Sequence, residues 1–248
     1  MVFKDHFSGH AETYAQARPS YPDALFDFLQ AQCASHDLAW DCATGNGQAA
    51  EALARIFKQV IATDGSAEQI AQARPAANIV YRQAAAEERF LEANSCDLIT
   101  VAQALNWFDL EAFFRNVEHS LKADGVLAVW SYGVHTINAS IDAVVTRLYE
   151  DILGDYWPPE RRLVENHYRD IEFPFVTSIE EGLSMERDWN MQQLRDYLHS
   201  WSALQRFMGK NGSDPFLFIE DDLKRAWGND GEKRYRVVWP LTVIVARQ

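Results

Sequence analysis

The stretch "WDCATGNGQAA", residues 40–50, brings a carboxylate and two glycines together at the end of an apolar run. Glycine permits a tight turn and lets a ligand approach the main chain. Apolar residues then recur at helical spacing, so the turn leads into a helix N-terminus with free N–H groups and partial positive charge. The segment "GNGQAA" also fits the dinucleotide pattern G-x-G-x-x-G/A. The turn therefore predicts a nucleotide or nucleoside site, and a strand-to-helix turn without a ligand is the alternative.

Two carboxylates narrow the class of ligand. Asp64 ends the next apolar run, "QVIAT", where a carboxylate can accept hydrogen bonds from both hydroxyls of a ribose. Asp41 lies directly before the glycine turn, where it would repel a pyrophosphate and favour an ammonium group. S-adenosylmethionine, a nucleoside with an amino-acid tail, meets both demands, whereas NAD(P) meets only the first.

The elements that position these residues follow a regular order. Apolar runs alternate with helical patterns between residues 38 and 132, and the strand candidates are "LAWDC", "QVIAT", "NIVYR", "CDLITVA" and "VLAVWSY". Asp109 is the expected N-cap of the helix after the fourth strand. Such alternation predicts a parallel sheet with helices on both faces, and ligands of such sheets bind at the carboxyl ends of the strands.

Four segments are expected along the chain. Residues 1–37 form an N-terminal helical arm, residues 38–137 the nucleoside-binding Rossmann-like core, and residues 138–174 a lid or substrate-recognition insertion. Residues 175–248 complete the sheet, because "GLSMERDW" and "RVVWPLTVIVARQ" have the composition of strands.

Composition limits the classes of function. With 248 residues, 48% of them hydrophobic, the chain is expected to be a soluble globular protein. No apolar run reaches about 18 residues and the N-terminus lacks a signal-peptide pattern, so we expect no membrane and a cytoplasmic location. The net charge of −13 argues against nucleic acid as a partner but permits a locally basic pocket for a small anion. Three scattered cysteines indicate neither a disulfide framework nor a zinc site, and no metal is expected.

Longer motifs resemble a known family. The chain is similar to class I S-adenosylmethionine-dependent methyltransferases, and most closely to the small-molecule branch of trans-aconitate methyltransferase-like proteins. The resemblance spans nearly the whole chain and is carried by "DCATGNG" for D-x-G/A-x-G-x-G, "AQALNWFD" for "AQALHWFD", "YAQARPSYP" for Y-x-x-x-R-P-x-Y-P, and "YLHSWSALQRF" for a "TWSA" segment. It implies an α/β fold with a seven-stranded, mostly parallel Rossmann-like sheet, helices on both faces, a C-terminal antiparallel hairpin and a helical lid insertion.

The resemblance also implies where S-adenosylmethionine, and its product S-adenosylhomocysteine, would bind. Gly45 and Gly47 would line the methionine part, Asp41 would support the loop or contact the amino group, and Asp64 would hold the ribose. The full set of expected cofactor-binding residues is Tyr14, Arg18, Asp41, Ala43, Gly45, Gly47, Asp64, Gly65, Ala85, Ala86, Glu87, Gln103 and Ala104. Two departures matter: Ala43 replaces the first glycine of the motif, and Ala85 stands where the family often has an acidic residue for the adenine amino group.

Methyl transfer to an activated carbon mainly requires alignment of the acceptor and exclusion of water. The catalytic candidates are Asn106, Trp107 and Tyr14, since an aromatic face can receive the sulfonium charge. Asn106 stands where the related pattern has histidine and cannot remove a proton, whereas a carboxylate acceptor is already deprotonated at neutral pH. We therefore expect a small acid methylated on oxygen, unless another base serves. The expected substrate-pocket residues, with core packing as the alternative, are Tyr21, Trp107, Trp130, Tyr132, Trp157 and Trp201.

Two other classes of function remain open. An NAD(P)-dependent oxidoreductase would share the glycine turn and Asp64, but Asp41 and the lack of a Tyr-x-x-x-Lys pair argue against it. A catalytically inactive S-adenosylmethionine-binding protein is favoured by the departures at Ala43, Ala85 and Asn106. The expected partner is a small-molecule acceptor, with the chain a monomer or homodimer, and neither nucleic acid nor membrane is expected as a partner.

Overall fold

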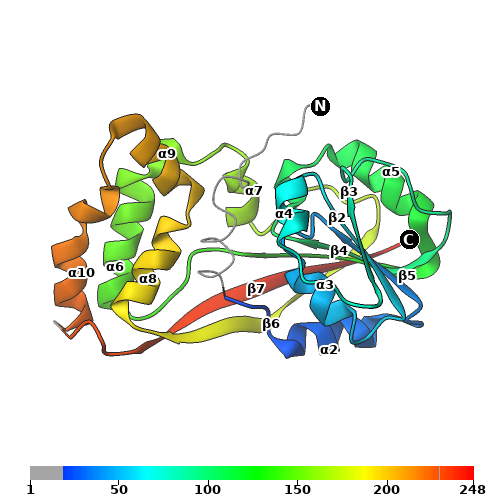
Figure 1. Cartoon of the computed structure of the whole chain (residues 1–248), viewed down its shortest axis with the longest axis horizontal. Coiled ribbons are helices and arrows are strands. Elements are labelled where there is room, and N and C mark those ends of the chain that lie inside the picture. The colour runs from blue at the N-terminus through cyan, green and yellow to red at the C-terminus, as the bar shows by residue number, and fades with distance from the viewer. Residues whose placement is uncertain (1–18, 229) are drawn as a thin grey trace.

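The computed structural model of the chain describes residues 19–228 and 230–248. Tyr14 and Arg18, which we expected near the cofactor, lie outside the described residues. A single seven-stranded sheet forms the centre of the molecule (Figure 1). Its strands are β1 (Leu38–Cys42), β2 (Gln59–Asp64), β3 (Ile79–Gln83), β4 (Cys96–Ala102), β5 (Leu121–Tyr132), β6 (Val176–Trp189) and β7 (Tyr235–Arg247).

The strand order is β3-β2-β1-β4-β5-β7-β6. Strands β1 to β5 are parallel, and β7 runs antiparallel to both of its neighbours, β5 and β6. This arrangement confirms the expected mostly parallel sheet with an antiparallel C-terminal pair. The order reverses between β1 and β4, so the carboxyl ends of these strands border the crevice where α/β sheets bind ligands.

Helices form two groups around the sheet. The first group, α2 (Asp23–Gln32), α3 (Gln48–Leu53), α4 (Ala67–Ala71) and α5 (Leu110–Ser120), packs on the parallel strands. The second group, which we call the helical lobe, gathers at one end of the long strands β6 and β7 in Figure 1. The lobe contains α6 (Ala139–Arg147), α8 (Met191–His199), α9 (Ser202–Asn211) and α10 (Glu220–Trp227).

Short helical turns complete the described chain. One of them, η2 (Leu105–Trp107), lies between β4 and α5. The others follow α6 or α9 in the sequence and are η3 (Leu148–Ile152), η4 (Gly154–Tyr156), α7 (Arg161–Glu165) and η5 (Pro215–Phe218). In Figure 1, α7 lies between the lobe and the parallel part of the sheet.

Sequence periodicity located most elements but not all of their ends. Asp109 caps α5 as predicted, because its carboxylate accepts a hydrogen bond from the Ala112 N–H. The same helix was expected to continue to "ADG", yet it ends at Ser120 and β5 begins at Leu121. Leu121 is fully buried and pairs with Cys96 of β4. Residues 121–125, which continue the helical pattern in the sequence, therefore belong to strand β5.

The sheet has an apolar core on each face. Leu98 and Ile99, neighbours in β4, enter different clusters because successive strand residues point to opposite faces. Leu25 of α2 lies in the first cluster and Phe113 of α5 in the second. Since β4 is buried on both faces, its sequence is rich in apolar residues at consecutive positions, with Asp97 and Thr100 as the polar exceptions, and the parallel strands were easy to predict for that reason.

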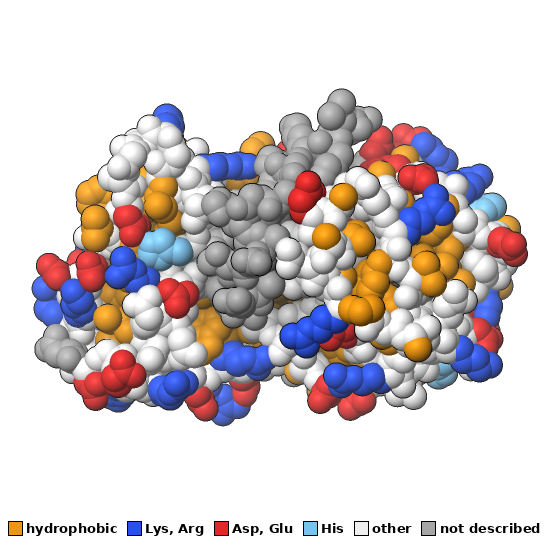
Figure 2. All heavy atoms as spheres, viewed as in Figure 1, with side chains coloured by type: hydrophobic (Ala, Val, Ile, Leu, Met, Phe, Trp, Pro, Cys, Tyr) orange, Lys and Arg blue, Asp and Glu red, His pale blue; other side chains and the backbone are white. Residues whose placement is uncertain are grey.

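On the outside, basic and acidic side chains are interspersed over the face shown in Figure 2.

The longest helix of the described chain, α5, has 11 residues, far fewer than the roughly 20 that a membrane-spanning helix needs. Within the described residues, therefore, no helix is long and apolar enough to cross a bilayer.

One histidine is enclosed by aromatic rings of α8 and β7. The ring of His135 packs 5.4 Å from that of Tyr197 and 5.6 Å from that of Trp239, measured between ring centroids. Neither ring nitrogen has a hydrogen-bond partner among the described residues, and burial lowers the pKa of His135 to about 3. The folded protein therefore holds this imidazole neutral.

Replacement of His135 by phenylalanine should weaken the acid sensitivity of folding. The unfolded chain protonates His135 below about pH 6.5, whereas the folded chain does not until about pH 3. The free energy of unfolding of the wild type therefore decreases by about 1.4 kcal/mol for each unit by which the pH is lowered over that range. Between pH 7 and pH 5 the wild type should lose about 2 kcal/mol more than His135→Phe, measured by urea unfolding. His119→Gln, on the partly exposed last turn of α5, is the control. Equal losses in wild type and His135→Phe would contradict the prediction.

Candidate active site

The glycine turn connects β1 to α3 through backbone that is strained for most residues. Ala43, Gly45 and Gly47 have φ angles of 56°, 58° and 87°, all in the left-handed region. At Gly47 a Cβ atom would lie 2.5 Å from the Tyr81 Oη, so only glycine fits there. Ala43 tolerates this conformation at a cost of roughly 1–2 kcal/mol. At Gly47 the turn therefore packs its main chain directly against Tyr81.

Asp41 supports the turn from below. It is fully buried, and its two carboxylate oxygens accept hydrogen bonds from the Thr44 hydroxyl at 2.5 Å and the Thr100 hydroxyl at 2.7 Å. Burial raises the pKa of Asp41 to about 6, although both hydroxyls act to lower it. The carboxylate thus joins the turn to β4 and carries a buried negative charge at neutral pH, close to the main chain of residues 43–47.

Asp64, at the end of β2, holds the other side of the turn. Its carboxylate accepts hydrogen bonds from the N–H of Gly45 at 2.9 Å and of Ser66 at 2.8 Å. Gly65 follows it directly, and its carbonyl accepts a bond from the Gln83 amide at 3.0 Å. The ends of β1, β2 and β3 are therefore connected through these side chains.

The segment after β3 is fixed to α5. The carbonyl of buried Ala86 accepts a hydrogen bond from the Asn116 amide at 2.9 Å. The Glu87 carboxylate accepts one from the Asp109 N–H at 2.8 Å, so it faces the start of α5. Ala85 is exposed between these anchors. An adenine ring placed here would meet main chain and the Ala85 methyl group, with no carboxylate at that position.

Strands β4 and β5 are linked at their carboxyl ends by Gln103. Its amide nitrogen donates to the Tyr132 carbonyl at 3.0 Å, and its amide oxygen accepts from the Tyr132 N–H at 3.2 Å. Gln103 adopts a φ of 57°, and buried Ala104 follows it. The Gln103 side chain is thus occupied by the strand beside it.

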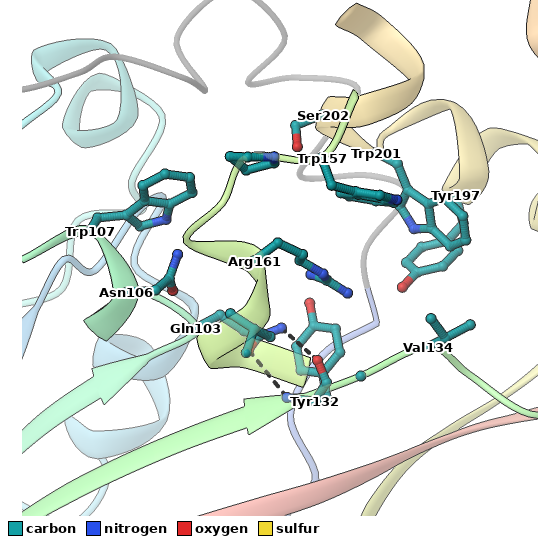
Figure 3. A pocket seen from close by; sticks show the side chains of 13 residues that line it. Gln103, Asn106, Trp107, Tyr132, Val134, Trp157, Arg161, Tyr197, Trp201 and Ser202 are labelled. Carbon is teal, nitrogen blue, oxygen red and sulfur yellow. Dashed lines mark hydrogen bonds between the residues drawn. The ribbon is translucent and has the colours of Figure 1, made fainter. Parts of the chain in front are cut away.

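A pocket opens beyond these two strand ends (Figure 3). Four of the six expected substrate residues line it, namely Trp107, Tyr132, Trp157 and Trp201. The pocket is shared between the sheet and the helical lobe, since Trp157 and Trp201 approach it from the lobe side. The other lining residues are Gln103, Asn106, Gly133, Val134, Pro158, Arg161, Val164, Tyr197 and Ser202.

The remaining two expected substrate residues lie elsewhere. Trp130 is fully buried in the sheet, and Tyr21 packs edge-on against it with ring centroids 5.4 Å apart. Trp130 and Tyr132 point to the same face of β5, but Tyr21 contacts the Trp130 ring. Neither Tyr21 nor Trp130 lines this pocket, and their packing is that of core residues.

Arg161 supplies the positive charge of the pocket. Its Nε donates to the Tyr149 hydroxyl at 2.9 Å, and its guanidinium lies 5.0 Å from the centroid of the Trp157 ring. Tyr149 in turn donates to the Glu165 carboxylate, which is 3.9 Å from the Arg161 Nε. Figure 3 shows the guanidinium end directed into the pocket. Within the described chain, no residue accepts a hydrogen bond from its two terminal amino groups.

Asn106 and Trp107, on η2, form the wall nearest β4. The Asn106 side-chain oxygen accepts a hydrogen bond from the hydroxyl of Tyr168 at 3.0 Å. Sequence reasoning did not select Tyr168, because a single tyrosine after a charged stretch carries no signal of burial. In the sequence, "YWPPERR" places Arg161 and Arg162 in the expected lid, where they could attract an anionic substrate or form a solvated charge pair. The partners of Arg161, Tyr149 and Glu165, are not apparent from spacing.

The fold and the turn together define a nucleoside-binding α/β protein, and comparisons with known proteins identify its class. A methyltransferase domain model matches residues 40–129. A protein of Dictyostelium discoideum named as an inferred methyltransferase is 34% identical over 252 residues, covering 99% of this chain and 96% of that one.

Solved structures agree with that match. The structure of an inferred type II methyltransferase from Anaeromyxobacter dehalogenans has a TM-score of 0.87 and 38% identity, covering 93% of this chain and 97% of that one. A Haemonchus contortus phosphoethanolamine N-methyltransferase, solved with S-adenosylmethionine, shares the fold at a TM-score of 0.52 and 17% identity, covering 97% of this chain and 57% of that one. The chain therefore belongs to the class I S-adenosylmethionine-dependent methyltransferases.

The residues present fit S-adenosylmethionine as the cofactor. The turn has the left-handed backbone of a glycine loop at Gly45 and Gly47, and Tyr81 leaves no room for a Cβ atom at Gly47. The buried Asp41 carboxylate lies under the turn and suits an ammonium group better than a pyrophosphate. Nothing in the family assignment supports the NAD(P)-dependent oxidoreductase or the inactive binding protein.

Proposed function

We propose that the chain methylates a small-molecule acid on a carboxylate oxygen, in the pocket between the sheet and the helical lobe. The observation that carries this proposal is the Arg161 guanidinium, which enters an aromatic-walled pocket with two amino groups free of described partners. A guanidinium in such a setting suits a carboxylate, to which it can donate two parallel hydrogen bonds. A single basic group in a pocket is also compatible with a chain whose net charge is −13.

The pocket lining supports an acceptor that needs no base. None of the 13 residues drawn in Figure 3 is Asp, Glu, His or Lys. A phenol or an ammonium group must lose a proton before it can attack, whereas a carboxylate is ionised at neutral pH. A carboxylate paired with Arg161 on one side keeps lone pairs on its other oxygen. The lining therefore favours an acid over an amine or phenol.

The cofactor site forms the second part of the proposal. Bound S-adenosylmethionine supplies a methyl group that its sulfonium already activates. The chain would hold the methionine part with Asp41, Ala43, Gly45 and Gly47, with Gln103 and Ala104 beside it at the β4 end. Asp64 and Gly65 would face the ribose, and residues 85–87 the adenine. Geometric support comes from the shared edge of the sheet, where all these positions end strands or follow them directly.

Four further expectations, on the family branch, the location, the oligomeric state and the partners, belong to the same proposal. Membership of the trans-aconitate methyltransferase-like branch agrees with an anionic acceptor. We also propose a cytoplasmic monomer or homodimer that does not bind nucleic acid, because basic side chains are interspersed with acidic ones on the face in Figure 2.

Binding of S-adenosylmethionine should depend on pH through Asp41. The pKa of Asp41 is about 6 in the free protein, and an ammonium group nearby would favour the ionised form. Binding then releases a proton below about pH 6, so affinity at pH 5 should be about tenfold weaker than at pH 7. Calorimetric titration at both pH values measures this. Asp41→Asn should bind weakly at both, and Asp124→Asn, at an exposed position of β5, should behave as wild type. Equal wild-type affinity at both pH values would contradict the prediction.

The test of function is an acceptor screen after cofactor binding is established. Calorimetry with S-adenosylmethionine, and with NAD and NADP as controls, comes first. The protein is then incubated with S-adenosylmethionine and benzoate, phenylacetate, fumarate or succinate, each beside its amide. We expect methyl esters and S-adenosylhomocysteine from at least one acid and none from the amides, measured by mass spectrometry. Preferential turnover of amines, phenols or amides would refute carboxylate methylation.

A further inference from the structure

We propose that Tyr168 orients Asn106 so that the amide N–H groups of Asn106, and not its oxygen, face the acceptor in the pocket. Asn106 then acts as a hydrogen-bond donor to an oxygen of the acceptor, and Tyr168 is a positioning residue. This inference rests on the proposed function for its acceptor class. The hydrogen bond between the two side chains, 3.0 Å long, is its starting observation.

Tyr168 is held in place by an unusual backbone. His167 and Tyr168 are consecutive non-glycine residues with φ angles of 53° and 59°, which costs free energy at each position. The Tyr168 N–H donates to the Leu163 carbonyl at 2.8 Å, closing the end of α7. The phenol ring is thereby fully buried behind η2. A conformation of this cost is retained where the surrounding contacts depend on it, and the contact it makes here is with Asn106.

The hydrogens around the phenol settle the direction of the bond. Burial raises the pKa of Tyr168 well above its ordinary value, so the phenol remains protonated. The main-chain groups of Asn106 and Leu105 lie near the phenolic oxygen and oppose this rise. A protonated phenol can donate, and the Asn106 side-chain oxygen is the acceptor of the Tyr168 hydroxyl at 3.0 Å.

The side-chain amide of Asn106 has an oxygen that accepts and a nitrogen that donates hydrogen bonds, and the partner of the oxygen is Tyr168. Its oxygen faces Tyr168, so its nitrogen, with two hydrogens, points the other way. Asn106 lines the pocket beside Trp107 and Gln103 (Figure 3), and no described residue accepts a hydrogen bond from its amide nitrogen. Gln103 cannot replace it, because both ends of its amide are bonded to Tyr132.

The pocket therefore presents two sets of donors, the Asn106 amide and the Arg161 guanidinium. Both favour an acceptor that is rich in lone pairs and has no hydrogen to donate. A carboxylate fits, whereas an ammonium group would leave both sets of donors unpaired and meet the Arg161 charge. Asn106 stands at the end of β4, next to the expected cofactor residues, so it is the donor placed to hold the reacting end of the acceptor.

The experiment follows the Asn106 side-chain amide by nitrogen-15 NMR in protein saturated with S-adenosylhomocysteine, with benzoate as the probe and benzamide as its control. The resonance is assigned by its loss in Asn106→Asp. We expect benzoate, but not benzamide, to shift it. Tyr168→Phe should move the resonance in the ligand-free state and weaken benzoate binding about tenfold, the value of one hydrogen bond of about 1.4 kcal/mol. Tyr235→Phe removes a hydroxyl that bonds the Trp227 carbonyl and should change neither.

Two substitutions at Asn106 test the donor without relying on the fold of Tyr168→Phe. In Asn106→Asp, Tyr168 occupies one oxygen and the other turns a negative charge to the pocket, so benzoate binding should fall at least 100-fold near neutral pH and recover in acid, where the carboxyl can donate. In Asn106→His, Tyr168 donates to one ring nitrogen, which leaves N–H on the other. That variant should bind within a few-fold of wild type.

The proposal is overturned if benzoate leaves the wild-type Asn106 resonance unmoved, or if Asn106→Asp binds benzoate as wild type does at neutral pH. An unmoved resonance and unchanged binding in Tyr168→Phe would equally overturn the role of Tyr168. These readouts are independent of turnover. A protein that binds S-adenosylmethionine but esterifies no acid would defeat the proposed function, while the orientation of Asn106 would still be decided by the resonance.

Discussion

Replacing Gly47 with alanine should nearly abolish S-adenosylmethionine binding, weakening it at least 100-fold, which corresponds to about 2.7 kcal/mol. Two penalties act together at this position. The φ of 87° lies where an L-residue is strained, and the new Cβ would meet the Tyr81 Oη at 2.5 Å and ring carbons at 3.0 and 3.1 Å. Moving the turn to relieve them would disturb the bond between the Gly45 N–H and Asp64, and with it the main chain offered to the ligand.

A second substitution separates these penalties. Tyr81→Ala in the Gly47→Ala background removes the steric contact but not the strained φ, so binding should recover in part. Gly209→Ala in α9 is the matched control, because nothing lies within 4 Å of its added Cβ and a helix prefers alanine by about 0.5–1 kcal/mol. Titration calorimetry gives the affinities and thermal unfolding the stabilities. Wild-type affinity in Gly47→Ala would show that the turn does not hold the cofactor.

The parallel half of the fold was accessible from sequence because burial on both faces leaves a strong signal. In β1 and β4 nearly every residue is buried, so both strands stand out in the sequence as short segments rich in apolar residues, despite Asp41 in β1 and Asp97 and Thr100 in β4. Capping chemistry then located the start of α5 at Asp109. Such local rules are enough to predict an element when the residues that it packs against are close to it in the sequence.

The helical lobe shows the limit of such rules. An amphipathic helix reveals that it has a buried face but not what covers that face. In the structure α6 packs against α10, although about 70 residues separate them. The antiparallel strands β6 and β7 are likewise connected through α8, α9 and α10 instead of a short turn. Periodicity gives no information about such long-range pairing.

The site divides in the same way. Asp41 and Asp64 were found because charged residues at the ends of apolar runs are conspicuous. Thr100, which bonds the Asp41 carboxylate, lies inside β4 and looks like an ordinary strand residue. Trp130 and Tyr132 have the same residue class, strand and facing direction, yet only Tyr132 lines the pocket, because Tyr21 packs on Trp130. The difference between Trp130 and Tyr132 is caused by Tyr21, which is more than 100 residues away in the sequence.

Arg161 is expected to decide which acceptors are used, because its surroundings fix its position before any ligand arrives. Nε is bonded to Tyr149, and the guanidinium lies over Trp157 as well as Tyr149. Glu165 is 3.9 Å from Nε and also accepts from Tyr149, so it restrains the arginine without occupying its terminal amino groups. Because the Arg161 guanidinium is already held in one position, it loses little conformational entropy when it binds an acid.

Arg161→Gln should therefore lower kcat/KM for a carboxylate acceptor by about 100- to 1,000-fold, since truncating one partner of a partly buried charge pair costs about 2–5 kcal/mol. Affinity for S-adenosylmethionine should stay within about twofold, because Arg161 approaches from α7 and not from the glycine turn. Arg161→Lys keeps the charge but loses the fork and should fall between wild type and Arg161→Gln. Arg162→Gln is the matched control, because the neighbouring arginine is exposed on the same helix. Steady-state rates with the acid found in the screen give the comparison. An equal loss of kcat/KM in Arg162→Gln and Arg161→Gln would mean that overall charge, and not the Arg161 guanidinium, recruits the acid.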